Sequence, residues 1–151
     1  MSRVTTPNAP APTLELVLTI RADISPAVEV GPSDGGTRRY IPIVGGSFDG
    51  RGLTGEVLPG GADWQLDRPD GITEIDAHYS IRAEDGTVII VRNRGIADRT
   101  RPGGQGPYLR SSPRFHAPAG PHDWLNRSVF VGTITPAADR SHVMVRVYES
   151  S

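Results

Sequence analysis

The sequence predicts an all-β protein, a single closed antiparallel β-barrel of about eight to ten strands with one short helical turn. Glycine (18) and proline (14) make up about a fifth of the 151 residues, which argues against a helical bundle. Short extended segments recur with turn signals between them at intervals of about 8–12 residues, as in barrels and sandwiches. Several segments alternate apolar and polar residues with a period of two, the pattern of half-buried strands.

The first predicted strand follows a lead-in, residues 1–12, that is rich in Pro, Ala and Thr and is expected to be disordered. The strand covers residues 13–21, and residues 13–151 are expected to form one barrel domain. The side chains expected to share the buried face of this strand are Leu14, Leu16, Leu18 and Ile20.

Turn sequences divide the middle of the chain. Residues 31–36 and 59–61 are rich in Gly and Pro, and Asp70-Gly71 and Asp85-Gly86 are tight-turn signals. The strands expected between these turns are 27–30, 39–44, 46–49 (after a break at Gly45), 53–58, 62–66, 72–83 and 87–93.

The last third of the chain begins with residues 97–107, which are predicted to be a loop that serves as a lid or binding loop or is disordered. Residues 108–115 are expected to be partly extended, and 121–126 to form one helical turn. Residues 128–135 and 141–149 predict a closing hairpin. The side chains expected on one face of its second strand are Val143, Val145 and Val147.

Composition argues against several classes of function. All sixteen basic residues are Arg. The net charge is −1, so the chain lacks the excess of positive charge that is typical of nucleic-acid-binding proteins. No Cys is present, no apolar run is long enough for a membrane helix, and no export signal precedes the first strand, so a cytoplasmic protein is expected. The four His include no His-x-His pair, and Asp76 with His78 on one strand face fits a solvated face better than a metal site. Because the histidines form no such site, we expect no metal, and we expect no cofactor either.

The stretch 55–65 (GEVLPGGADWQ) carries the strongest candidates for chemistry. Alternation sends Asp63 and Trp64 to opposite faces of a strand. Ala62, Trp64 and Leu66 form the apolar set, which favours Trp64 inside. Asp63 would face inward only if the interior is polar or the corner carries a bulge, and burial would then raise its pKa as a general base requires. The alternative is a turn-capping Asp beside a packing Trp.

Other polar and aromatic side chains complete the predicted site. Tyr79 shares a face with Ile75, Ala77 and Ile81, so its hydroxyl is expected to point inward and to need a partner. The candidate catalytic residues are thus Asp63 and Tyr79. The candidate ligand-binding residues are Trp64, Asp76, Arg110, Arg114 and Trp124, with the tryptophans as walls and an arginine as the anchor of a carboxylate or enolate.

Five groups of residues, in this order, resemble the domain-of-unknown-function family 3237 over about residues 13–149. They are Tyr40-Ile41-Pro42-Ile43 with Gly45-Gly46 and Phe48, the string GEVLPGGADW at 55–64, Asp76-Ala77-x-Tyr79, Asp85-Gly86 and Trp124-Leu125-Asn126. The resemblance implies a small soluble bacterial or fungal β-barrel, calycin-like in appearance, and implies no activity.

Two functions remain open from the sequence. The first is a cofactor-independent enzyme, an isomerase, cyclase, lyase or hydratase, that acts on a small anionic or carbonyl-bearing metabolite in the barrel. The second is a carrier or sensor of a small apolar metabolite, which needs only a cavity. A subunit of a homo-oligomer, with a filled barrel and a purely structural role, is a third possibility.

Overall fold

The structure is a computed structural model that describes residues 3–4, 8–102 and 106–151, which form ten strands and one 3-10 helix. The elements in chain order are β1 (Leu14–Ile24), β2 (Val28–Ser33), β3 (Gly36–Gly50), β4 (Leu53–Val57), β5 (Gly61–Asp67), β6 (Ile72–Ala83), β7 (Val88–Pro102), β8 (Pro107–His116), η1 (Asp123–Asn126), β9 (Phe130–Pro136) and β10 (His142–Ser150). Residues 1–2 and 5–7 of the predicted lead-in lie outside the described residues.

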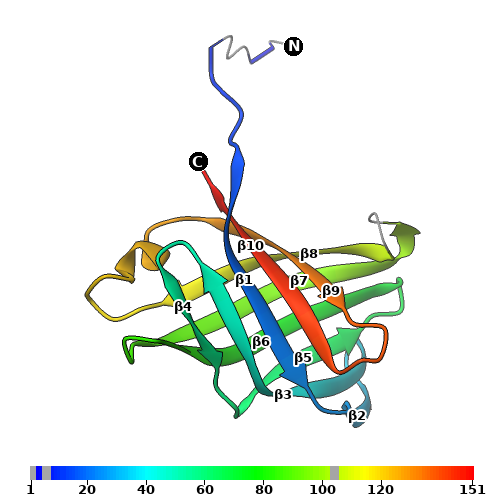
Figure 1. The fold of residues 1–151 in the computed structure, drawn as a ribbon. Helices are drawn as coiled ribbons and strands as arrows, with labels where there is room; N and C mark the ends of the chain where they lie inside the picture. Colours follow the sequence, from blue (N-terminus) through cyan, green and yellow to red (C-terminus); the bar gives the residue numbers. More distant parts are fainter. Residues whose placement is uncertain (1–2, 5–7, 103–105) are drawn as a thin grey trace.

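Eight strands close into an antiparallel barrel, which confirms the predicted fold class (Figure 1). Their order is β1-β10-β9-β8-β7-β6-β4-β3, and the ring closes where β1 pairs with β3. The strand β5 continues the line of β4, because both lie between β3 and β6. The strand β2 pairs with the first half of β3 and lies outside the ring.

Most predicted strands are confirmed, and β6 has the predicted bounds. The predicted break at Gly45 is wrong, because β3 is one strand that passes from β2 and β5 to β1 and β4. At Gly46 the φ angle is 132°, and a Cβ would lie 1.9 Å from the Arg21 carbonyl oxygen, so glycine lets the strand continue there.

The buried face predicted for β1 is half wrong. The pairing with β10 shifts between Leu16 and Leu18, so Val17 is an extra residue in a β-bulge. A bulge reverses the alternation, and therefore Leu14 (53% exposed) and Leu16 (49%) lie outside, whereas Val17, Leu18 and Ile20 are buried.

The predicted loop 97–107 is largely strand. Residues up to Asp98 pair with β6 and β8, and Pro102 pairs with Pro107 at the tip of the hairpin. The inward-facing residues Gly95 and Ala97 are small, and arginines precede them. This part of β7 therefore lacks the large apolar residues at every second position that would have predicted a strand. Gly103-Gly104-Gln105, within this predicted loop, lies outside the described residues.

The two ends of the barrel differ. At one end, here called the η1 end, η1 packs against β8, and the apolar core includes Leu53, Ile89, Phe115, Leu125 and Phe130. Buried His122 lies next to η1 and bonds Asp85 of the β6–β7 turn, Nε2 to Oδ2 at 2.8 Å. No helix in the described ranges is long and apolar enough to cross a membrane.

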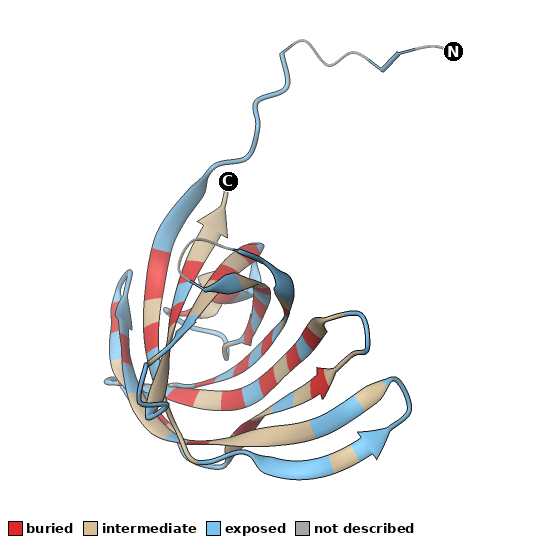
Figure 2. Cartoon of the chain, turned by 90° about the vertical axis from the view of Figure 1, so that its right-hand side faces the viewer, coloured by how far each residue is buried: buried red, intermediate tan, exposed pale blue. Residues whose placement is uncertain are grey.

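The other end, here called the hairpin end, carries the β5–β6, β7–β8 and β9–β10 turns (Figure 1). Figure 2 views the molecule from this side and shows buried and exposed residues alternating along the strands. The inward-facing positions here include small and polar residues beside large apolar ones such as Ile75.

Candidate functional site

Three polar side chains follow one another on the inner face of β5. Asp63 pairs with Ala77, Gln65 with Ile75 and Asp67 with Thr73, and all three partners on β6 are buried inward-facing residues. Side chains of paired residues lie on the same side of a sheet, so Asp63, Gln65 and Asp67 also face into the barrel.

Trp64 consequently faces outward, and the expectation that it lies inside is wrong. Its side chain is 53% exposed and packs on Tyr40, with the ring centroids 4.5 Å apart. Ala62, Trp64 and Leu66 therefore share the outer face of β5. Leu66 is buried on this face because the β2–β3 turn covers it, with Gly35 next to it. The alternation of apolar residues along β5 was identified correctly, but the apolar face is the outer face of the strand and not the inner one.

Hydrogen bonds join the inward side chains into a chain that we call the polar wall: Asp63, Gln65, Arg39, Asp67 and Thr73. Gln65 Nε2 donates to Asp63 Oδ2 at 2.7 Å, and Arg39 Nε donates to Gln65 Oε1 at 3.0 Å. Arg39 binds both oxygens of Asp67, at 2.6 and 2.9 Å. Thr73 Oγ1 donates to Asp67 Oδ1 at 2.6 Å. Because Arg39 only donates, the Gln65 amide is oriented with its NH₂ group toward Asp63.

The two carboxylates of this wall have opposite electrostatic environments. Burial is the largest effect at Asp63 and raises its pKa, although hydrogen bonds from Gln65 and from the Asp76 backbone N–H (3.1 Å to Oδ1) oppose the shift. The hydrogen bonds from Arg39 lower the pKa of Asp67 to about 2. Asp67 is therefore a structural anion, whereas Asp63 is a carboxyl group that protonates more readily than usual.

A second inward-facing polar residue, Asn93, lies two strands away from Asp63. Asp63, Ala77 and Asn93 occupy the same level of three adjacent strands. Neighbouring strands are about 4.8 Å apart, so the backbones of Asp63 and Asn93 are about 10 Å apart, and the residue on the strand between them is the small Ala77. Buried Tyr79 follows on the inner face of β6, and burial raises the pKa of its phenol, which keeps the hydroxyl protonated as a donor.

Three buried polar atoms of the described interior have no hydrogen-bond partner: Tyr79 Oη, Asn93 Oδ1 and Ser111 Oγ. Their residues are 6%, 1% and 5% exposed. A buried polar group without a partner costs about 1–3 kcal/mol. Native proteins retain few such groups, and those that remain call for an explanation such as a catalytic role.

The other predicted ligand-binding residues lie elsewhere. Asp76 is on the outer face, where Arg92 binds both its oxygens (3.1 and 2.9 Å) and lowers its pKa. Arg110 pairs with Ile96, next to inward-facing Leu109, and bonds the Leu109 carbonyl at 2.7 Å. Arg114 is exposed and pairs with Arg92. Trp124 lies on η1, with its ring 6.3 Å from that of Phe130. The structure therefore brings Asp63 and Tyr79 together and separates both from the predicted anchors.

The sequence analysis missed several inward polar residues. Gln65 and Asp67 could have been found from Asp63, because the three alternate on one strand. Asn93 follows Ile89 and Val91 on one face in the same way. Within the described ranges no three His, Asp or Glu side chains are grouped as a metal site requires.

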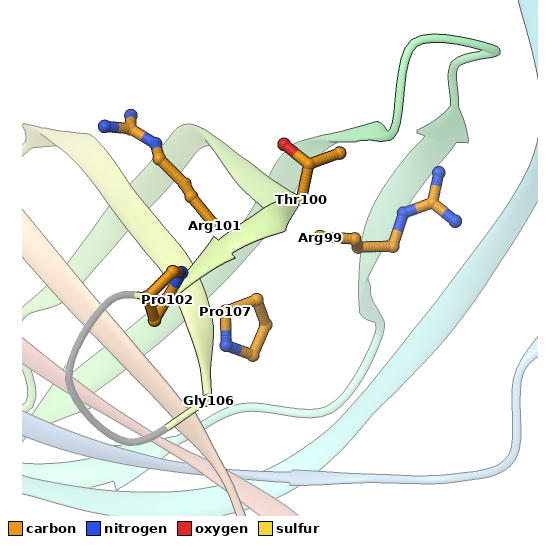
Figure 3. A pocket seen from close by; sticks show the side chains of 6 residues that line it. All are labelled: Arg99, Thr100, Arg101, Pro102, Gly106 and Pro107. Carbon is orange, nitrogen blue, oxygen red and sulfur yellow. The ribbon is translucent and has the colours of Figure 1, made fainter.

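A surface pocket lies at the tip of the β7–β8 hairpin. The residues lining it are Arg99, Thr100, Arg101, Pro102, Gly106 and Pro107. The side chains of Arg99 and Arg101 point in opposite directions, so they form no convergent anion site (Figure 3). Convergent polar groups are the mark of a binding site, and in this protein they lie inside the barrel.

The fold and the interior together define a small β-barrel protein with polar side chains inside one end. The chain belongs to the DUF3237 family, described as proteins of unknown function, whose family model matches residues 12–150. A UPF0311 protein of Rhodopseudomonas palustris is 38% identical over 151 residues, covering 91% of this chain and 97% of that protein.

Solved structures show the same fold. A β-barrel-like protein of Acinetobacter baumannii is 29% identical with a TM-score of 0.85, over 97% of this chain and 100% of that one. A structure described as an enzyme from Penicillium herquei is 23% identical with a TM-score of 0.73, and the match covers all of both chains. At that identity the likeness shows the fold alone.

Proposed function

We propose that the hairpin end of the barrel interior binds a small organic molecule and that Asp63 is the acid–base group acting on it. The observation that carries the proposal is the inward-facing Asp63 carboxyl, whose pKa is raised by burial, next to polar groups without partners. A general base is most effective when its pKa lies closer to the working pH than that of an exposed carboxylate.

The chemistry that this arrangement supports is a proton transfer without net oxidation. The Asp63 carboxylate takes a proton from the bound molecule, and the same proton is returned at a second position, so that Asp63 is regenerated. The Tyr79 hydroxyl donates a hydrogen bond to the ligand oxygen on which negative charge develops. Isomerisation and cyclisation proceed by such steps. In an elimination the proton returns to the leaving oxygen, which departs as water, and in a hydration Asp63 takes the proton from the added water and returns it to the ligand; none of these reactions needs a cofactor.

A carrier or sensor of a small apolar metabolite is the second candidate. Inward-facing Ala77, Gly95 and Ala97 favour it, because they give part of the wall a small apolar lining. The two candidates differ in what is released: a carrier releases the molecule that it bound, whereas an enzyme releases another.

The test is native and denaturing mass spectrometry of the protein purified from its own host. We expect the wild type to retain a small molecule and Ala77→Leu to lose it, because the larger side chain fills the space between Asp63 and Asn93. His78→Leu, on the outer face of the same strand, is the matched control and should retain it. A wild type without a compound, or equal retention by Ala77→Leu, would contradict the proposal. Incubating the compound with fresh protein then separates enzyme from carrier.

A further inference from the structure

Four side chains that carry hydrogen-bond donors form a two-by-two block on the outer face of β7 and β8, which we call the donor block: Arg92, Arg94, Ser112 and Arg114. Arg92 pairs with Arg114, and Arg94 pairs with Ser112. All four residues are exposed. The Cβ atoms of paired residues lie about 5 Å apart, and alternate residues of one strand lie about 7 Å apart, so the long arginine side chains can reach one ligand group together.

The pairing of Arg92 with Arg114 places two positive charges directly opposite each other, which destabilises a sheet. The carboxylate nearest to them is Asp76, on the β6 side of β7. Arg92 binds both oxygens of Asp76, and Arg94 Nε lies 3.9 Å from one of them. Arg114 lies on the other side of β7 and has no ion-pair partner among the described residues. Three guanidinium charges of the block are therefore opposed by one carboxylate.

The surrounding part of the barrel adds to this positive charge. Residues 88–151 hold nine arginines and four acidic residues, whereas residues 1–87 hold seven arginines and thirteen acidic residues. The strands of residues 88–151, β7 to β10, are consecutive neighbours in the barrel, so the excess of arginine lies on one side of it (Figure 1). This side attracts anions although the net charge of the whole chain is −1.

We propose that the donor block binds a doubly charged oxyanion, the phosphate group of a phosphate monoester. The planar fork of an arginine matches the oxygens of a phosphate. Arg92 uses two of its five N–H donors on Asp76, which leaves the others, with those of Arg114 and the Ser112 hydroxyl, for the ligand. A phosphate monoester carries close to two negative charges at neutral pH, and it balances the two positive charges that Asp76 leaves uncompensated. This site lies on the outer face of the barrel, so it does not depend on the function proposed for the interior.

The first test measures binding of small phosphate probes by amide chemical shifts at pH 8 and low salt. Phenyl phosphate, a dianion, should shift the amide signals of residues 92, 94, 112 and 114. Dimethyl phosphate, a singly charged diester like those of a nucleic-acid backbone, should bind at least about threefold more weakly. Equal or tighter binding of the diester would assign this face to a phosphodiester backbone and overturn the proposal. Shifts confined to other residues, or no binding of phenyl phosphate, would overturn it as well.

Replacing Arg114 separates a site from a general attraction. Arg114→Gln should weaken phenyl phosphate binding at least about threefold. Arg38→Gln is the matched control, because Arg38 is an exposed residue of β3 with no ion pair in the described part of the chain and the change removes the same charge. The control should bind phenyl phosphate as the wild type does. Equal weakening by both variants would show attraction to the net charge alone and would contradict a site at the donor block.

The second test measures melting temperatures in low-salt buffer without phosphate. Because Arg114 repels Arg92, its removal loses no favourable charge contact. Arg114→Gln should therefore leave the melting temperature unchanged or raise it by up to about 4 °C. A fall beyond that of Arg38→Gln would show that Arg114 has a structural partner and would overturn the proposal, while the function proposed for the barrel interior would still stand.

Discussion

Replacing Asp63 with asparagine is expected to lower turnover of the retained compound at least about 100-fold, because an amide cannot accept the proton. The change should move the melting temperature by only a few degrees. Burial raises the pKa of Asp63 in the folded protein. The ionised carboxylate is therefore less stable in the folded protein than in the unfolded chain, and removing its charge favours the fold at neutral pH. One of the two accepted hydrogen bonds is lost, which costs about 1 kcal/mol and offsets that gain.

Asp49→Asn is the matched control for this variant, because Asp49 is an exposed residue of β3 with no ion pair among the described residues. It should retain full turnover and the same melting temperature. Full turnover by Asp63→Asn would remove Asp63 from the mechanism. A large fall in its melting temperature would instead assign Asp63 a structural role.

Gly61→Ala is expected to be strongly destabilising although it removes no polar contact near the site. Gly61 faces Tyr79, and a Cβ there would lie 2.4 Å from Tyr79 Cβ and 2.7 Å from the His78 carbonyl oxygen. The backbones of β5 and β6 must separate to admit it, at a cost of about 2–3 kcal/mol. The melting temperature should fall by roughly 5–10 °C, and turnover should fall because Asp63 and Tyr79 lie on the two strands that separate.

Gly45→Ala is the control for Gly61→Ala. The nearest atom to a Cβ on Gly45 is Asp23 Oδ2 at 3.9 Å, and its φ angle is not in the left-handed region. Alanine should therefore be neutral or slightly stabilising there, through the unfolded chain. Equal melting temperatures for Gly61→Ala and wild type would show that β5 and β6 are not held as closely as the structure places them.

Strand existence and inward-facing residues could be predicted where alternation is uninterrupted. The period of two along β6 placed Ile75, Ala77, Tyr79 and Ile81 inside, and the structure agrees. The same reasoning failed in β1, because the bulge at Val17 leaves no mark in local sequence. It depends on pairing with β10, which a reading of one segment does not contain.

In the candidate site, too, local alternation was predictable and the contacts between strands were not. Alternation placed Asp63 and Trp64 on opposite faces, but which face is interior depends on what covers the outside of β5. The β2–β3 turn covers Leu66, so an apolar set that resembles a barrel core lies on the outer surface. Pairing between Arg39 and Asp67, 28 positions apart, depends on the order of the strands. Single-strand periodicity carries no information about that order.

The ionisation of Asp63 tests the central claim most directly. Carbon-13 NMR of the side-chain carboxyl groups, followed from neutral to acidic pH in wild-type protein, reports each aspartate separately. We predict a midpoint for Asp63 above the ordinary 3.8, with Asp67 in the same sample near 2 as the internal comparison. A midpoint for Asp63 at or below 3.8 would show a well-solvated or ion-paired carboxylate and would contradict its role as a buried acid–base group.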